Sequence, residues 1–296
     1  MALQFVGATN GIGTNDDYYV SLSGSLAGGI ASSPAAGDLV VVVSAFGNTT
    51  SSAPAVSGNV TGAYTGFNAP VHVNDIWDTE FGTFYAVMGG TPDTTLTITR
   101  ATNAAYGGAT VVMVFRGQRI TTPIYSNSAY TTITNASRAV PASPMVNTVG
   151  DFVVAMAAGT QGTTGSSFTV PVELTSGNRS VKADGTTSDI GVWMAYQSAS
   201  STGTFTISAA TGGTTSTNSS GAAHSFVIAG IVTHSTSGSL TGQGSAVAGS
   251  ANRLRAFATS GVLIGPGSII VGTADWSCAK SKDSRFIKAF VTNFAS

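Results

Sequence analysis

The apolar positions of this chain fall in short runs separated by Gly, Ser, Thr and Asn, and one set of runs occurs twice in the same order. Gly37–Val43 reads Gly-Asp-Leu-Val-Val-Val-Val and Gly150–Met156 reads Gly-Asp-Phe-Val-Val-Ala-Met, so the offset from residue 37 to residue 150 is 113. Further matches, at offsets of 109 and 113, pair Phe84–Ile98 with Trp193–Ile207 and Gly107–Gly117 with Ser220–Gly230. Loops of different length between equivalent strands make the offset between the two copies change, here from 113 to 109, and then return to 113. The pattern therefore predicts a tandem, duplicated β-domain.

Within each copy the apolar runs are bounded by turn residues, which is typical of strands. The strands predicted in the first copy are Tyr18–Leu22, Leu39–Phe46, Val71–Trp77, Phe84–Met88, Leu96–Thr99 and Thr110–Phe115. Those predicted in the second copy include Phe168–Leu174, Val192–Tyr196, Thr204–Ser208 and Ser225–Ile228. The turn-rich run Gly89–Asp93 predicts a hairpin between two strands of the first copy.

Neither copy contains an amphipathic helix, so we expect an all-β fold. The predicted architecture is two tandem β-sandwich (jelly-roll-like) domains plus a small Gly-rich C-terminal β segment. The expected boundaries are 1–118 for the first sandwich, 119–231 for the second and 232–296 for the C-terminal segment.

The C-terminal segment has a repeat of its own. Ser237–Ser245 aligns with Ser260–Ser268 at an offset of 23 residues, from 237 to 260, and Pro266-Gly267 predicts a hairpin tip there. Two units of this size cannot bury a core alone, so we expect the segment to pack against other protein. Phe286, Phe290 and Phe294 then share a face in either a helix or a strand, which leaves the type of this last element open.

Composition adds a restriction on function. Charged residues make up 8% of the 296 residues and hydrophobic residues 42%, with Ser, Thr, Gly and Asn in place of the missing charge. Because a soluble monomer usually carries more charge, we interpret the deficit as surface that faces other subunits or carries Ser/Thr-rich loops. An uncharged but soluble monomer is the alternative. With a single cysteine, Cys278, the chain has no intrachain disulfide framework.

The charge is unevenly distributed. Residues 1–230 carry six basic and eleven acidic groups, and residues 231–296 carry six basic and two acidic groups, so the formal charges are −5 and +4. A positive end beside a negative body can orient a contact with an acidic partner. The candidate interface residues are Arg253, Arg255, Lys280, Lys282, Arg285 and Lys288. They are too few and too dispersed to indicate nucleic acid, and a solvated face is the simpler reading.

Motifs for catalysis or cofactor binding are missing from the sequence. The histidines, His72, His224 and His234, have no metal-ligand spacing, and neither a nucleophile elbow nor a phosphate-binding loop occurs. The densest acidic group is Asp75, Asp78 and Glu80, which we interpret as a solvated loop. We therefore expect no enzyme activity, no cofactor and no metal.

Two further features admit both a functional and a structural interpretation. Trp77 beside the acidic group could stack on a sugar ring, although a core or interface role is the simpler expectation. In the two Gly-Asp pairs, Gly permits a tight turn into the strand, and Asp accepts neighbouring backbone N–H groups, which fixes the strand register. We expect Asp38 and Asp151 to be structural.

The repeated Gly-Asp strand motif and the closing Ser-Gly-x-Leu-x-Gly-x-Gly-Ser repeat resemble those of tailed-bacteriophage virion proteins. That group includes head decoration (cement) proteins, fibres and other tail appendages built from β-sandwich modules with Gly/Ser/Thr/Ala-rich ends. The resemblance implies a structural role, self-association and no cofactor, and it transfers no site residues.

Together these observations predict a virion structural protein, most simply a capsid-surface decoration protein that acts by protein–protein packing. Its expected partners are copies of itself and other virion proteins such as the major capsid protein or tail proteins, without nucleic acid or membrane. No secretory signal is visible at Met1–Phe5, which favours synthesis and assembly in the bacterial cytoplasm and a place in the virion. The alternatives are a tail fibre or other tail appendage, a carbohydrate-binding adhesin that uses Trp77 or the loop 159–167, and a depolymerising hydrolase.

Overall fold

Every regular element that the structure describes is a β-strand. The computed structural model describes residues 2–13, 17–47, 54–73, 79–99, 107–118, 123–133, 137–138, 140–144, 146, 148–161, 171, 173–174, 176–183, 189–208, 210–211, 221–231, 260–265 and 268–273. Within these ranges there is no α-helix, and therefore none of the length and apolar character that a membrane crossing requires. The predicted all-β class is confirmed.

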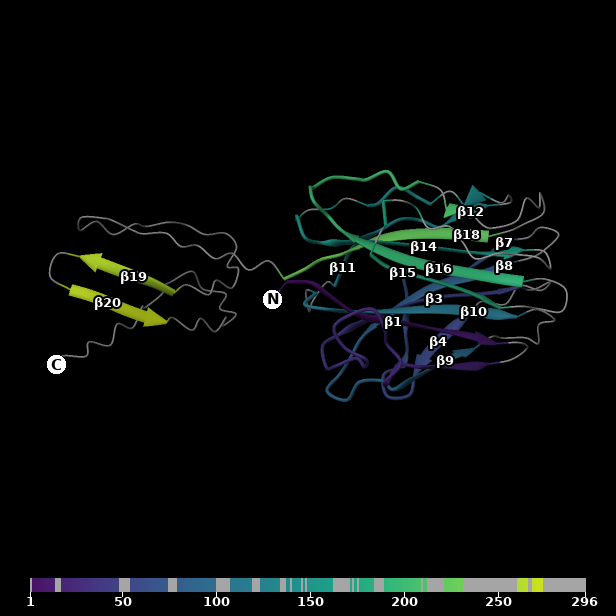
Figure 1. The fold of residues 1–296 in the computed structure, drawn as a ribbon, viewed down its shortest axis with the longest axis horizontal. Helices are drawn as coiled ribbons and strands as arrows, with labels where there is room; N and C mark the ends of the chain where they lie inside the picture. The colour runs from purple at the N-terminus through teal and green to yellow at the C-terminus, as the bar shows by residue number, and fades with distance from the viewer. Residues whose placement is uncertain are drawn as a thin grey trace, which may run out of the picture. The chain divides into compact units, whose positions relative to one another are not determined.

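The first copy forms a six-stranded antiparallel sheet (Figure 1). Its order is β1-β10-β3-β8-β6, with β7 also paired to β8. The strands are β1 (Gln4–Gly13), β3 (Leu39–Gly47), β6 (Thr65–Gly66), β7 (Val71–Val73), β8 (Thr79–Val87) and β10 (Gly108–Arg116). The central strand β3 is buried along its whole length, as its Val-rich, doubly apolar sequence predicts.

The second copy forms a six-stranded sheet with the same arrangement. Its order is β11-β18-β14-β16-β15, with β12 also paired to β18. The strands are β11 (Ile124–Asn127), β12 (Thr131–Ile133), β14 (Phe152–Gln161), β15 (Ser176–Ala183), β16 (Asp189–Ser198) and β18 (Gly221–Ile228). Strand for strand, β11, β18, β14 and β16 take the places of β1, β10, β3 and β8, so the duplication read from the sequence is present in the topology.

The pairing registers refine the alignment of the copies. Leu39 pairs with Phe115 in the first copy and Phe152 with Ile228 in the second, which places both strand pairs at the predicted offset of 113. On the other side of these strands, Leu39 pairs with Val87 in β8 and Phe152 pairs with Ser198 in β16. The offset between β8 and β16, from residue 87 to residue 198, is therefore 111. The sequence offset of 109 for this strand is therefore wrong by two residues. Because side chains alternate with a period of two, the slip leaves every residue on its predicted face.

A bulge recurs at the same place in both sheets. The register of β1 shifts between Phe5 and Gly7, opposite Phe115 and Val114. The register of β11 shifts between Ile124 and Ser126, opposite Ile228 and Val227. At the offset of 113 these are equivalent partners, so the bulge is a shared feature of the two copies. Bulges bend an edge strand and increase its twist.

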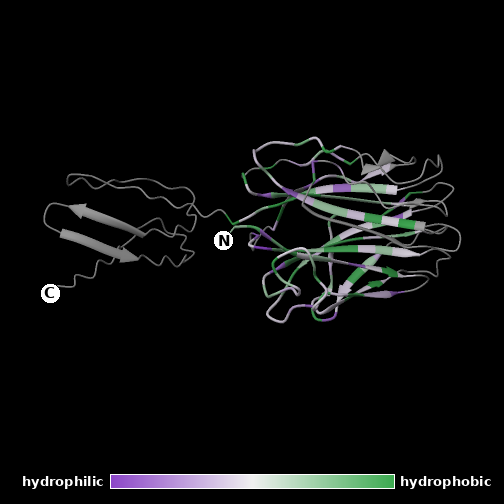
Figure 2. Ribbon diagram, viewed as in Figure 1, coloured by the Kyte–Doolittle hydropathy of each residue, from purple (hydrophilic) through white to green (hydrophobic). Residues whose placement is uncertain are grey.

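The two sheets pack face to face through one shared hydrophobic core. The first sheet contributes alternate residues such as Leu39, Val41 and Val43, and the second contributes Val154 and Met156, all fully buried. Figure 1 shows β14, β16 and β18 layered on β3 and β10, and Figure 2 shows apolar positions along the strands of both layers. Each copy therefore covers one face of the other.

Two groups of aromatic rings join the sheets within this core. In one, Phe115 and Phe152 lie with ring centroids 5.9 Å apart, and Phe152 stacks on Tyr196 at 4.8 Å. In the other, the rings of Phe67 and Phe226 lie 4.4 Å apart. Pairs at these separations add to the stabilisation from burial alone.

The outer faces of the two sheets are covered differently. The first sheet is covered by a four-stranded sheet of order β2-β9-β4-β5, and Val40 and Val42 pack there on Leu96 and Ile98. Its strands are β2 (Tyr18–Ser21), β4 (Ala55–Gly58), β5 (Gly62–Ala63) and β9 (Thr95–Thr99).

The second sheet is covered mostly by segments without strand structure, in the part of the chain that is described. Its outer core contains the fully buried Trp193 with Val146, Leu174 and Ile207. A short pair, β13 (Ser137–Arg138) with β17 (Ala210–Thr211), lies in the same copy. A complete sandwich in each copy, and jelly-roll connectivity, stay predictions.

Two local predictions are wrong, and a third is wrong where it is described. Of the predicted strand Phe168–Leu174, the described residues Pro171, Glu173 and Leu174 are not in a strand, and Leu174 N–H donates to Pro171 O at 3.0 Å. Thr204–Ser208 is not a strand, although Ile207 is buried as predicted. The run Gly89–Asp93 is not a hairpin, because β8 and β9 belong to different sheets and the run crosses between them.

The chain divides into two compact units, Met1–Val232 and Thr233–Ser296. The predicted boundary at 118/119 lies inside the first unit and stays a prediction, since the two copies share a core. In the second unit β19 (Ser260–Gly265) pairs with β20 (Ser268–Thr273), and Gly265 pairs with Ser268. The strands on both sides of Pro266-Gly267 are therefore paired as predicted. The Ser237–Ser245 repeat and the Phe286–Phe294 stripe lie outside the described residues.

The shared core predicts that the copies unfold together. Met113→Ala in the first sheet and Met156→Ala in the second should each lower the free energy of unfolding by about 2 to 5 kcal/mol, the usual effect of truncating a buried Met. Both variants should shift one cooperative urea transition, followed by tryptophan fluorescence and far-UV circular dichroism. Two separate transitions, each moved by one substitution only, would contradict a shared core.

Candidate functional site

The residues singled out for interaction lie outside the described residues. These are Trp77 and the basic residues Arg253, Arg255, Lys280, Lys282, Arg285 and Lys288. Asp75 and Asp78 lie outside them as well. The glycan and interface predictions for these residues therefore stay predictions.

The described member of the acidic group, Glu80, is not in a solvated loop, so that interpretation is wrong for this residue. Glu80 lies in β8 directly opposite His72 in β7, and its side chain is 2% exposed. Its Oε1 is 2.8 Å from Nδ1 of His72. Strand pairing thus places an acidic and an imidazole group side by side and holds the carboxylate within the sheet.

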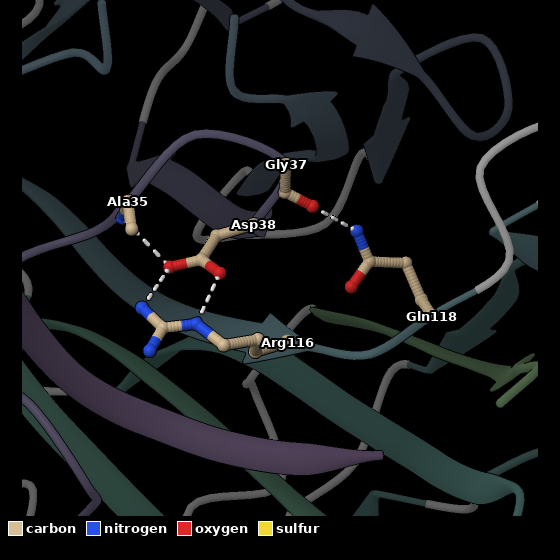
Figure 3. Close-up of polar contacts among 5 residues, drawn as sticks. All are labelled: Ala35, Gly37, Asp38, Arg116 and Gln118. Carbon is tan, nitrogen blue, oxygen red and sulfur yellow. Dashed lines mark hydrogen bonds and ion pairs between the residues drawn. The ribbon is translucent and has the colours of Figure 1, made fainter. Parts of the chain in front are cut away.

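The Gly-Asp pair of the first copy builds a turn that anchors the start of β3 (Figure 3). Gly37 has φ +82°, which an L side chain rarely adopts. The Asp38 carboxylate is fully buried and accepts Ala35 N–H at 2.7 Å, as predicted for a register-fixing Asp. It also accepts two hydrogen bonds from Arg116, from Nε at 2.7 Å and from Nη2 at 2.8 Å. The amide of Gln118 donates to Gly37 O.

This bidentate pair ties the turn to the end of β10. Sharing hydrogen bonds with Asp38 raises the pKa of Arg116 above its usual value, so the guanidinium is charged at any working pH. Sequence reasoning found Asp38 but missed Arg116, because residues 38 and 116 are brought together only when β3 pairs with β10.

The Gly-Asp pair of the second copy repeats the turn with other partners. Gly150 has φ +92°, and its N–H donates to Ala199 O at 2.9 Å, as Gly37 N–H donates to Met88 O. Asp151 Oδ1 accepts Gly230 N–H at 3.0 Å. The place of Arg116 is taken by Ala229, 113 residues later. Asp151 Oδ2 is then buried without a hydrogen-bond partner among the described contacts.

Three of the six exposed large hydrophobic side chains among the described residues lie at the end of the body that carries both turns. Ile30 is 54% exposed, Val149 60% and Ile231 40%. Ile30 N–H donates to the O of Phe5 at the start of β1, and Ile231 N–H to the O of Gly117 beyond the end of β10. Val149 precedes the turn into β14. We call these three side chains the hydrophobic end.

A buried polar cluster lies inside the shared core, between β8 and β18. His224 is fully buried, with Nδ1 3.2 Å from Thr83 Oγ1 and Nε2 3.5 Å from Asn68 Nδ2. Thr83 Oγ1 in turn lies 2.8 Å from the hydroxyl of Tyr130. The imidazole is therefore assigned as neutral, donating from Nδ1 and accepting at Nε2. The Phe67 and Tyr130 rings lie 5.3 Å and 5.1 Å from it.

Burial in this apolar setting lowers the pKa of His224 from 6.5 to about 3, because the charged imidazolium is poorly solvated there. Burial also raises the pKa of the Tyr130 hydroxyl. A neutral histidine and a neutral tyrosine with few exposed atoms suit a structural network that joins the two copies. His224 is therefore a structural histidine whose two ring nitrogens both have partners.

A small pocket opens on the outer face of the second copy. Its volume is about 140 Å³, with buried Val153, Leu174, Ala199 and Ile207 at its base. Its rim carries Glu173, Gln197, Ser198, Ser200, Phe205 and Thr206. Sequence reasoning missed it, because its walls come from four separate stretches, residues 153, 173–174, 197–200 and 205–207. Elsewhere in the described part, no group of three or more His, Cys, Asp or Glu side chains could hold one metal ion.

Comparison of the chain with protein-family models, with curated proteins and with solved structures gives no match.

The two turns predict unequal effects of one substitution. Asp38→Asn removes the carboxylate to which Arg116 donates two hydrogen bonds. It should lower the free energy of unfolding by about 2 kcal/mol, the usual size for charge-assisted hydrogen bonds. Asp151→Asn keeps an acceptor for Gly230 N–H and should lower it by less than about 1 kcal/mol. Urea unfolding at neutral pH measures both values. Equal losses in the two variants would show that the Asp38–Arg116 pair contributes nothing beyond the turn itself.

The buried imidazole predicts a stability loss on acidification. Between pH 6.5 and about 3 the unfolded chain binds a proton at His224 and the folded chain does not. The contribution of His224 to the free energy of unfolding is therefore complete above pH 6.5. It decreases as the pH is lowered from 6.5 to about 3, by at most about 1.4 kcal/mol per pH unit. His224→Gln should flatten the fall in unfolding free energy measured at pH 7, 5.5 and 4.5.

Tyr130→Phe is the matched control, because it alters the same cluster without a group that titrates in this range. It should keep the slope of the unsubstituted protein. A His224→Gln variant with an unchanged slope would mean that the acid sensitivity arises elsewhere.

Proposed function

We propose that this chain is a structural protein of a tailed-bacteriophage virion, and within that class a capsid-surface decoration protein that acts by packing against neighbouring subunits. The sequence resemblance is the first support for the proposal. The fold is the second support, because two sheets that share one hydrophobic core form a rigid β-body, which suits a structural protein.

The use of polar groups within the body supports a non-enzymatic role. Asp38 is held by Arg116, and Asp93 accepts Val60 and Thr61 N–H at 2.6 and 2.9 Å. His224 joins the two sheets as a neutral group. In each case a buried titratable side chain fixes a turn or a strand. An active site usually combines such groups in a cleft that a substrate can reach.

The hydrophobic end is the observation that carries the proposal. Ile30, Val149 and Ile231 come from three separate segments at the end of the body that carries both Gly-Asp turns. Large apolar side chains exposed together at one end are candidates for a protein contact. The chain continues from this end into residues 232–296, which contain all six candidate basic residues. We propose that the hydrophobic end packs against a neighbouring subunit, and that residues 232–296 make an anchoring contact of their own.

Binding of purified protein to particles that lack it tests the proposal. The unsubstituted chain should co-sediment with the particles, and residues 1–231 alone should stay in the supernatant while keeping the melting temperature of the body. An Ile30→Ser/Val149→Ser double variant should bind at least about ten-fold more weakly, because two anchors of an interface are lost. Tyr19→Ser, on an exposed strand of the outer sheet, is the matched control and should bind normally.

Cryo-electron microscopy of saturated particles separates the outcomes. Extra density on the capsid surface would support the decoration role. Extra density on the tail would reject that role in favour of a tail appendage. Binding by residues 1–231 equal to that of the full chain would show that residues 232–296 make no anchoring contact. Failure of the full chain to bind any part of the particle would reject the virion proposal.

A further inference from the structure

The pocket of the second copy arises from a difference between two equivalent places in the duplicated fold. In the first copy Met88 N–H donates to Asp38 O, and Gly37 N–H donates to Met88 O, at 2.8 and 2.9 Å. In the second copy Ala199 makes the same two bonds with Asp151 and Gly150, at 2.8 and 2.9 Å. Ala199 therefore occupies the position of Met88.

The shorter side chain at this position leaves more space in the second copy. Met88 is buried in the outer core of its copy, and its sulfur accepts Asp93 N–H at 3.4 Å. Ala199 has only a methyl group at the equivalent position, and it lines the pocket.

The pocket has an apolar base and a polar rim. Val153 and Leu174, each under 5% exposed, are part of the base, and the ring of Phe205 is half-buried at its side. Hydroxyl, amide and carboxylate groups surround the mouth. At about 140 Å³ the space is far below the roughly 300 Å³ at which sites for drug-sized ligands begin, so it suits one ring rather than an extended ligand.

The carboxylate at the rim is held in position by its neighbour. Glu173 Oε2 accepts the hydroxyl of Ser208 at 2.6 Å and the N–H of Ser208 at 3.1 Å. The Ser208 hydroxyl bond lowers the pKa of Glu173, so this group is an ionised acceptor at neutral pH. Both hydrogen bonds are to Oε2, and together they fix the orientation of the carboxylate, including that of its other oxygen, Oε1.

We propose that this pocket binds a single pyranose ring, such as the terminal sugar of a glycan. A pyranose has an apolar C–H face for Phe205 and the base, and hydroxyls for Glu173, Gln197 and the serine and threonine groups of the rim. A cationic side chain is the poorer fit, because Glu173 is the single carboxylate among the lining residues. The inference does not depend on the virion proposal, since it rests on the body alone.

Saturation-transfer NMR with the full chain tests the inference. The probes are the methyl glycosides of glucose, galactose, mannose and N-acetylglucosamine, with butylamine as the cationic probe. At least one glycoside should bind, with a dissociation constant on the order of millimolar, as expected for a ligand of this size. Butylamine should not bind.

Refilling the pocket is the decisive variant. Ala199→Met restores the side chain that the first copy has at this position and should abolish glycoside binding without lowering the melting temperature. Glu173→Gln and Phe205→Leu keep the packing and should each weaken binding at least about five-fold, so they decide the matter if Ala199→Met fails to fold. Thr65→Ala, exposed in the first copy, is the control and should bind as the unsubstituted chain does.

The contradicting results are equally specific. Glycoside signals that persist in all three pocket variants would place binding elsewhere, and the absence of any glycoside signal would reject the inference. Butylamine binding that is lost in Glu173→Gln would assign the pocket to a cationic group instead.

Discussion

The contact on which the rest of the structure depends is the face-to-face burial of two equivalent sheets in one core. Each of β3 and β14 is apolar on both faces, so neither sheet could expose its inner face to water. Burial of apolar area is the dominant favourable term in folding, and here each copy supplies the area that the other must cover. The duplication is therefore a condition of stability in this body and not merely a repetition of modules.

A core shared in this way restricts where polar groups can lie. His224 and Thr83 sit within it only because strands from both copies position their partners, and the imidazole is kept neutral at the expense of acid stability. At the ends of the strands the constraint is weaker, and the copies have diverged. Asp38 has Arg116 as its partner, whereas Asp151 faces Ala229 and binds a backbone N–H instead. The turn survives this change because its backbone bonds to Met88 and Ala199 are the same in both copies.

Sequence reasoning reached the all-β class, the duplication and the buried central strands, because these follow from local runs of Val, Ile and Phe with turn residues between them. It failed where neighbours decide the outcome. Gly89–Asp93 has the composition of a hairpin, yet it crosses between sheets because β9 pairs with β2 and β4. Thr204–Ser208 alternates like a strand but has no partner strand among the described residues. Arg116 and the pocket could not be found, since each depends on residues far apart in the chain that only the sheet register brings together. Glu80 was found, but its pairing with His72 was not, because that pairing depends on the register of β7 and β8.

The outer faces show what duplication makes possible once the inner faces are fixed. The first copy closes its outer core with a four-stranded sheet, and Asp93 holds the connection that seals it through Tyr64 and two backbone N–H groups. The second copy lacks an equivalent of that Asp and has Ala199 in place of Met88, so its outer core remains partly open at Ala199. Because the shared inner core supplies stability to both copies, the outer face of one could change without loss of the fold. A binding function would then arise on that outer face, where packing is least constrained, while the inner sheets continue to serve as the scaffold.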